Sequence, residues 1–247
     1  MAVSGGYLAV QIRAAALRQI VGFREYIFGE VLPAFGNLDQ KANKVADEYY
    51  AQVGAQIASE YDYVDMADVA DDAQDRAIDF YEMAVSIRQT MLNLLAVGLF
   101  HLAEQQLAHS CRDGAFTVEP PQNTQWAKVV AWYSQHFMLD LESLPSWTVM
   151  DELRLVANAV KHAEGAATKH LRELRPELFR NPILDRVGEM FGPDNLEIPP
   201  FEVYLPLAGE DLFVRDALLE LYTQSAESFF AEIADYFEAH EGEYLPR

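Results

Sequence analysis

The chain has 247 residues, half of them hydrophobic, with a single cysteine and a formal charge of −21 at pH 7. This composition excludes a disordered chain, a disulfide-stabilised domain and a protein that coats nucleic acid with a broadly basic surface. Because Cys111 cannot form an internal disulfide and neither a signal peptide nor a membrane-length apolar run is seen, we expect a cytoplasmic protein with no membrane partner.

Apolar residues at helical spacing predict three long helices in the first half of the chain. The first is expected over residues 7–30 and the second over residues 37–60. An acidic linker, 62–72, leads to the longest periodic segment, 72–111. This segment is apolar nearly all round, which is typical of a central helix, and we expect a kink near Gly98.

The second half predicts further helices over residues 124–137, over 146–174 (running on through Gly165) and over 216–236. Between the last two, residues 201–205 and 211–214 read as two short strands of a hairpin. We therefore predict an all-α fold, a bundle of about six helices with a small C-terminal β-hairpin, in a single domain covering residues 1–247.

One predicted helix, after Ser146, carries a polar stripe opposite an apolar one. At about 100° per residue, four polar side chains fall within roughly a quarter-turn: Arg154, Asn158, Lys161 and His162. The opposite side is apolar: Leu153, Val156, Ala159, Val160 and Ala163. Cations and amide donors on one stripe suit a phosphate or another anion. The alternative is the solvent face of an ordinary surface helix.

The same stretch is the most basic part of an acidic chain. Residues 154–186 contain seven Lys or Arg against four Asp or Glu, together with His162 and His170. Residues 60–82, by contrast, are strongly acidic. We therefore expect any anionic ligand to bind within residues 154–186.

The pattern Asn158-Ala-Val-Lys161-His162, after a long central helix, resembles the motif of the HEPN superfamily (higher eukaryotes and prokaryotes nucleotide-binding). The resemblance covers about residues 70–175, and the hairpin with the last helix, 200–238, lies outside it. The family motif is an Arg, usually followed by a polar residue such as Asn, then a few residues and a His. Here Ala157 stands where the Arg would precede Asn158, and Arg154 lies one turn earlier on the same face.

The resemblance implies a metal-independent endoribonuclease of a bacterial toxin–antitoxin or phage-defence system. In that reading Arg154, Asn158 and His162 are catalytic and Lys161 binds the ligand. A His can transfer protons near neutral pH and an Arg can clamp a phosphate. No cofactor or metal is implied.

The expected partners also follow from the resemblance. They are a second copy of the chain, an RNA substrate, and an antitoxin or another protein. A homodimer would supply a second proton-transfer group, and Trp126, Trp132 and Trp147 look like more apolar surface than one bundle covers. If Arg154 cannot replace the missing Arg, the chain is a catalytically silent HEPN-like module that binds a nucleotide or a protein. An unrelated helical interaction protein is the third alternative.

Two other groups of residues are candidate chemical sites. His101, Glu104 and Gln105 share one helix face, and His109 follows in the sequence, but no second pair at the spacing of a bundle metal site occurs. We expect instead a buried His101 bonded to a neighbouring carboxylate or carbonyl, and no metal. Cys111 has no basic partner in the pattern and is expected to be inert.

Overall fold

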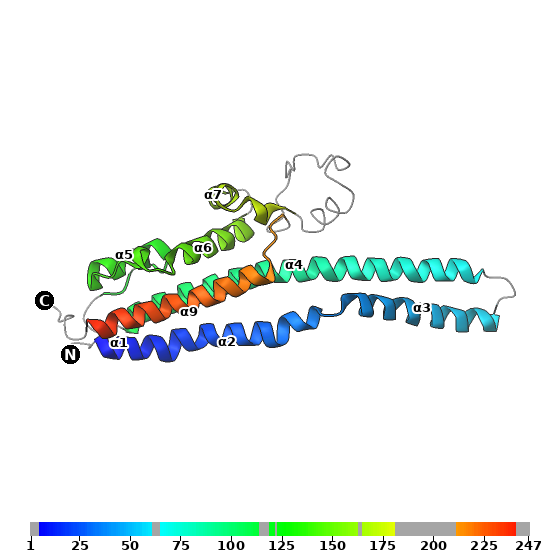
Figure 1. Cartoon of the computed structure of the whole chain (residues 1–247), viewed down its shortest axis with the longest axis horizontal. Coiled ribbons are helices and arrows are strands. Elements are labelled where there is room, and N and C mark those ends of the chain that lie inside the picture. The colour runs from blue at the N-terminus through cyan, green and yellow to red at the C-terminus, as the bar shows by residue number, and fades with distance from the viewer. Residues whose placement is uncertain are drawn as a thin grey trace. The chain divides into compact units, whose positions relative to one another are not determined.

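A computed structural model of the chain describes residues 5–60, 65–113, 119–121, 123–162, 165–180 and 211–240 (Figure 1). The fold over these residues is all-α, as the periodicity predicts. The elements in chain order are α1 (Gly5–Ile12), the π-helix η1 (Arg13–Leu17), α2 (Arg18–Tyr26), the π-helix η2 (Ile27–Val31), the 3-10 helix η3 (Leu32–Phe35), α3 (Leu38–Glu60), α4 (Met66–Asp113), α5 (Trp126–Phe137), the 3-10 helix η4 (Leu141–Ser143), α6 (Trp147–His162), α7 (Ala166–Leu174), the 3-10 helix η5 (Pro176–Phe179) and α9 (Asp216–Ala239).

These elements form two compact units. Unit 1 consists of Met1–Glu25 and Leu92–Arg247, and unit 2 of Tyr26–Met91. The single domain expected from the sequence stays a prediction.

Helix α9 is the centre of unit 1. It packs against α1, η1 and α6, and Figure 1 shows it between α1 and α6. Its side chains at helical spacing are buried, among them Tyr222, Phe229 and Phe237. The ring of Trp126 lies 6.0 Å from that of Phe229 and 5.9 Å from that of Trp147, so α5, α6 and α9 share one aromatic core.

Helix α4 differs from the prediction in two respects, where it begins and whether it is kinked near Gly98. It begins at Met66, six residues early, because the Asp65 carboxylate accepts a hydrogen bond from Ala67 N at 2.9 Å and starts the helix. It also runs on as α-helix past Gly98. A Cβ at Gly98 would lie 3.8 Å from the Phe23 ring, so this glycine marks close packing rather than a break. By length and composition alone α4 could cross a membrane, as core helices of soluble proteins also could.

The predicted helix over 146–174 is wrong in its length, since it is two helices. Helix α6 ends at His162 and α7 starts after Gly165, whose backbone is extended (φ −113°, ψ −178°). Helix α7 packs back against α6. The side chains of Thr168 and Leu171 are the buried ones of α7.

The predicted C-terminal hairpin is not shown. Its first strand, 201–205, lies outside the described residues, and residues 211–214 form no strand in the part of the chain that the structure describes. The amide of Asn93, only 2 % exposed, takes the place of a strand partner. Its Nδ2 donates to Leu212 O at 2.6 Å, and its Oδ1 accepts from Val214 N at 3.2 Å. A side-chain amide thus satisfies backbone groups of the buried residues Leu212 and Val214.

Unit 2 pairs α3 with the first half of α4 along a row of small side chains. Among the side chains of unit 2 whose burial is described, few apolar ones are buried: Ile27, Ala42, Val69, Ala73 and Ala77. The guanidinium of Arg76 lies 4.1 Å over the Tyr49 ring and adds a cation–π contact to this seam. The large apolar side chains on the outside of α4 are left exposed.

Candidate functional site

The polar stripe of α6 lies on the side of the helix away from the core. Arg154 and Asn158 are half-buried, whereas Lys161 and His162 are exposed. The buried side is wider than the sequence analysis expected, because Leu155 and Ala157 belong to it as well. Ala163, which was assigned to the apolar stripe, lies outside the described residues.

Arg154 has a partner one turn back on its own helix. Its Nε donates to Asp151 Oδ1 at 2.6 Å, and the two side chains are 29 % and 30 % exposed. Ala157, at the position where the HEPN motif has its Arg, is fully buried. An Arg at position 157 would point into the core. The guanidinium on the polar stripe is that of Arg154, and it is already paired with Asp151.

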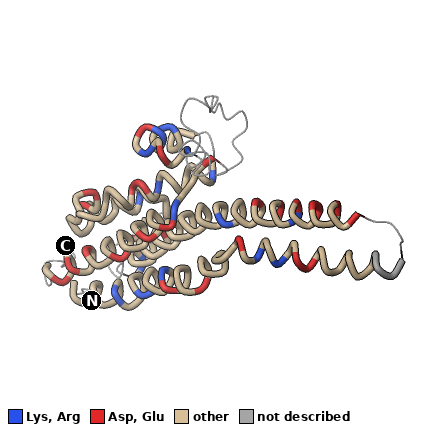
Figure 2. Tube along the Cα trace, turned by 45° about the vertical axis from the view of Figure 1, so that its right-hand side comes forward, with Lys and Arg blue, Asp and Glu red and all other residues tan. Residues whose placement is uncertain are grey.

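Lys161 and His162 are placed differently. Within the described ranges neither side chain has a hydrogen-bond or ion-pair partner. They are the last two residues of α6, where cations also complement the negative end of the helix dipole. In Figure 2 the tube of α7 also carries Lys and Arg positions, in blue, together with acidic ones, in red. Lys169 and His170 of α7 are exposed. We call these four residues, at the end of α6 and on α7, the α6–α7 corner.

The start of α7 adds hydrogen-bond donors to this corner. Gly165 occupies the N-cap position and offers no side chain to cap the first N–H groups, and the first turn contains no acidic residue. Uncapped N–H groups and the positive end of a helix dipole favour anions.

An ionic cluster around the buried Glu152 carboxylate ties α7 to α6, and the sequence pattern did not predict it. Glu152, 9 % exposed, accepts hydrogen bonds at Oε1 from Arg175 Nη1 at 2.5 Å and from the Tyr222 hydroxyl at 2.7 Å. Arg175 also donates from Nε to Glu177 at 2.5 Å. The only signal in the sequence was a carboxylate on the apolar side of an amphipathic helix, and its partners lie 23 and 70 residues away.

The charges in this cluster shift one another's pKa. Burial and the neighbouring Glu152 carboxylate raise the pKa of Tyr222. Burial alone would lower the pKa of Arg175, but its bonds to Glu177 and Glu152 raise it. The same guanidinium lowers the pKa of Glu177. Arg175 therefore stays charged and ties the end of α7 to α6, while Tyr222 ties α6 to α9.

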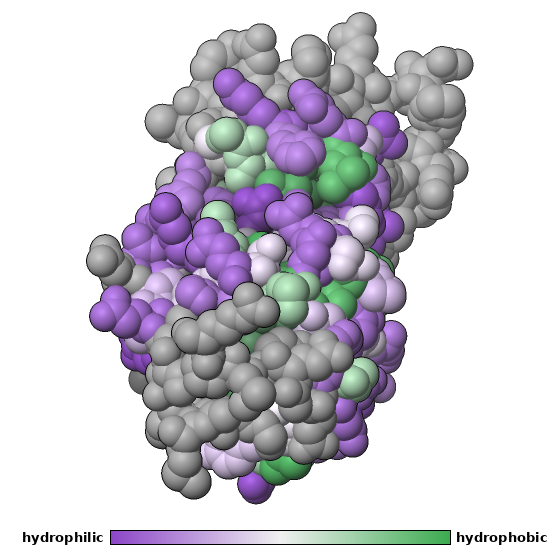
Figure 3. Space-filling model, turned by 90° about the vertical axis from the view of Figure 1, so that its left-hand side faces the viewer, coloured by the Kyte–Doolittle hydropathy of each residue, from purple (hydrophilic) through white to green (hydrophobic). Residues whose placement is uncertain are grey.

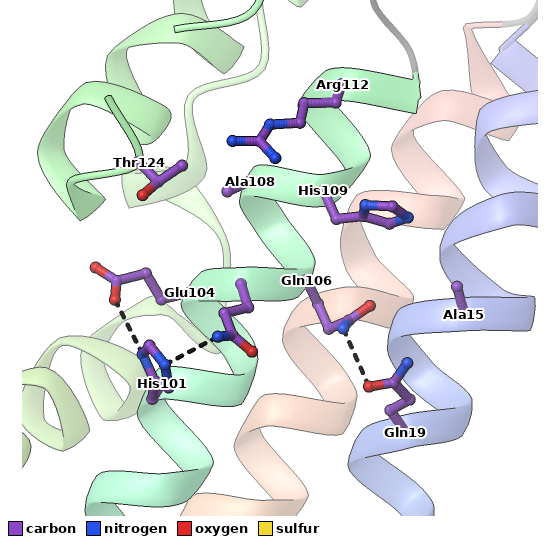
Figure 4. A pocket seen from close by; sticks show the side chains of 10 residues that line it. Ala15, Gln19, His101, Glu104, Gln106, Ala108, His109, Arg112 and Thr124 are labelled. Atoms are coloured by element: carbon purple, nitrogen blue, oxygen red, sulfur yellow. Dashed lines mark hydrogen bonds and ion pairs between the residues drawn. The ribbon is translucent and has the colours of Figure 1, made fainter. Parts of the chain in front are cut away.

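A second candidate site is a pocket of about 550 Å³ on the C-terminal half of α4 (Figure 4). Its lining includes His101, Glu104, His109 and Arg112. His101 is exposed rather than buried as predicted, because it faces outward with Nε2 2.9 Å from Gln105 Nε2 and Nδ1 3.6 Å from Glu104. Among the described residues no three His, Cys, Asp or Glu side chains could hold a metal ion together.

The tryptophans do not supply the apolar surface from which a homodimer was expected. Trp126 is 8 % and Trp132 is 5 % exposed, and Trp126 stacks on Trp147 within one chain. On the face of the molecule shown in Figure 3, hydrophilic side chains predominate and apolar ones are scattered among them.

The α6–α7 corner thus places exposed Lys and His side chains beside the start of α7, with an ion-paired Arg154 on the preceding turns of α6. Comparison of the chain with family models, with curated proteins and with solved structures finds no match.

Proposed function

We propose that the protein is a HEPN-like helical module of a bacterial stress or defence system that binds a phosphate-bearing ligand, RNA or a nucleotide, at the α6–α7 corner. The observation that carries the proposal is the position of Lys161 and His162, exposed and without a partner among the described residues, next to the uncapped start of α7. Phosphate oxygens are the acceptors that such a group of N–H donors fits.

Cleavage of RNA is a second candidate function. It is favoured by one observation, the exposed imidazole of His162 on the same side of α6 as Arg154. Arg154 is held by Asp151, however, and Ala157 offers no second guanidinium. Binding needs only the free cations, whereas cleavage also needs a clamp on the developing phosphorane charge. The arrangement therefore supports binding better than catalysis.

The binding test uses a fluorescently labelled single-stranded RNA and measures anisotropy, with ATP as competitor. Lys161→Ala/His162→Ala should weaken binding at least about tenfold, because two donors to phosphate are lost. The matched control is Lys128→Ala/His136→Ala, which removes an exposed Lys and His from α5 and should leave affinity unchanged. Binding by the wild type no tighter than about 10⁻⁴ M, with no response to ATP, would contradict the proposal.

The same proteins separate binding from cleavage. RNA incubated with wild type in EDTA should stay intact if the module only binds. Should it be cut, His162→Ala must lower the rate about 10²-fold or more, since it removes the proton-transfer group. A cut that survives His162→Ala would assign cleavage to a contaminant.

A further inference from the structure

The outer face of α4 in unit 2 combines a row of carboxylates with exposed apolar side chains. The acid row consists of Asp68, Asp72, Asp75, Asp79 and Glu82, all exposed. They are spaced alternately by four and three residues, so they lie along one side of the helix over about 21 Å. Met83 and Ile87, 56 % and 48 % exposed, follow on one flank of the row, and Ile78, 46 % exposed, lies on the other.

These apolar side chains are not part of the seam between α3 and α4. That seam is built from Val69, Ala73 and Ala77, which are buried at fourfold spacing. A hairpin of two helices with so few buried large side chains gains little from its own packing, because helices in water depend on burying an apolar face. The outer face of α4 is therefore suited to cover by a further element.

We propose that this face docks an amphipathic helix of a partner protein, with Lys or Arg flanking its apolar stripe and a length of about four turns, roughly 14 residues. Charge complementarity identifies the occupant. Residues 26–91 contain thirteen Asp or Glu against four Lys or Arg. Arg76 is already engaged over the Tyr49 ring, and Lys44 with Glu48. The acid row would repel a second copy of itself and attract a basic helix.

The test uses full-length protein and two labelled synthetic peptides of 14 residues. One carries Leu at coiled-coil spacing with Lys elsewhere, and the other has Glu in place of each Lys. In anisotropy titrations the Lys peptide should bind and the Glu peptide should not. Hydrogen exchange of the wild-type complex should show protection within residues 66–91.

Three double variants locate the site. Met83→Glu/Ile87→Glu removes the apolar contact, and Asp72→Lys/Asp79→Lys reverses the acid row. Each should weaken the Lys peptide at least about tenfold. Glu142→Lys/Glu220→Lys changes the net charge by the same amount as Asp72→Lys/Asp79→Lys, but at exposed positions of unit 1. It should change the affinity for the Lys peptide by no more than about twofold. Circular dichroism checks that each variant is helical. If a variant unfolds, hydrogen exchange of the wild-type complex still tests whether the peptide protects residues 66–91.

Several results would overturn the proposal. Equal loss in the unit 1 control would show general attraction to an acidic protein. Equal binding of the Glu peptide, or protection outside 66–91, would place the peptide elsewhere. Sedimentation showing a dimer that Met83→Glu/Ile87→Glu dissociates would mean that a second copy covers the face.

Discussion

At the scale of single residues, Arg175 and Tyr222 reach the Glu152 carboxylate from two other elements, the end of α7 and α9. A buried carboxylate with two donors is stable only while both remain, because an unpaired buried charge is costly. The cluster fixes the angle at which α7 leaves α6. The geometry of the α6–α7 corner thus depends on Glu152, which lies outside the corner itself.

Glu152→Ala should lower the free energy of unfolding by about 2 kcal/mol or more. Removing one partner of a buried pair costs about 3–5 kcal/mol, and the 28 % exposure of the Arg175 side chain and its bond to Glu177 reduce this. Glu152→Gln, which keeps an acceptor oxygen, should cost less. Glu173→Ala on the exposed side of α7 should stay within about 0.5 kcal/mol in the same urea titrations. Equal effects of Glu152→Ala and Glu173→Ala would contradict the role of the cluster.

Cys111 is fully buried, and burial raises the pKa of its thiol from 9.0 to about 12. A thiol titrating so high has about 10³-fold less thiolate at neutral pH. We expect iodoacetamide to label native protein very slowly and denatured protein at the normal rate. Because the folded state favours the neutral thiol, this group's contribution to stability is present below pH 9.0 and is lost as pH rises toward the folded pKa. Rapid labelling of native protein, read by mass spectrometry, would count against this burial.

At the scale of elements, the α6–α7 corner joins two helix ends of opposite polarity. The last turn of α6 carries Lys161 and His162 against its negative end, while α7 begins with uncapped N–H groups at its positive end. The negative end of α6 explains why Lys161 and His162 are compatible with the fold. The positive end of α7 explains why a bound anion would be stabilised there.

Gly165→Asp should raise the stability of the protein and lower its affinity for RNA. The extended backbone of Gly165 suits an N-cap, so an Asp there should stabilise the protein by about 0.5–1 kcal/mol. Its carboxylate would also occupy the N–H groups offered to a phosphate, so RNA affinity should fall about tenfold. Thermal melting and RNA anisotropy on the one variant measure both. A variant that is more stable and binds RNA undiminished would show that the start of α7 takes no part.

At the scale of the whole molecule, a basic corner is set in a chain of charge −21. Long-range repulsion from the other carboxylates opposes any polyanion, so binding rests on local contacts. With about three phosphate contacts to the corner, the slope of log K on log salt should be about −2. Anisotropy at several salt concentrations measures it. A slope near zero would mean that the ligand is not held through phosphates.

The homodimer stays a prediction at this scale, and its basis has changed. The tryptophans are covered within one chain, so the remaining argument is that RNA cleavage of the HEPN type needs His162 of two subunits. Static light scattering at micromolar concentration should give the mass of two chains if that reading is right. A monomer that binds RNA would be compatible with the proposed binding module and would contradict a ribonuclease of the HEPN type.

The sequence by itself determined the helical class, most helix positions and the stripe that holds Arg154, Asn158, Lys161 and His162. These follow from periodicity, which depends on the 3.6-residue turn of the backbone and not on distant partners. The tertiary structure alone decided where α6 ends, that Glu152 is paired, and that the amide of Asn93 bonds the extended backbone after residue 211. Glu152 and Asn93 bond partners that lie far along the chain, and only packing brings them within hydrogen-bond distance. The end of α6 goes with the packing of α7 back against it, which overrides the helical periodicity of the sequence.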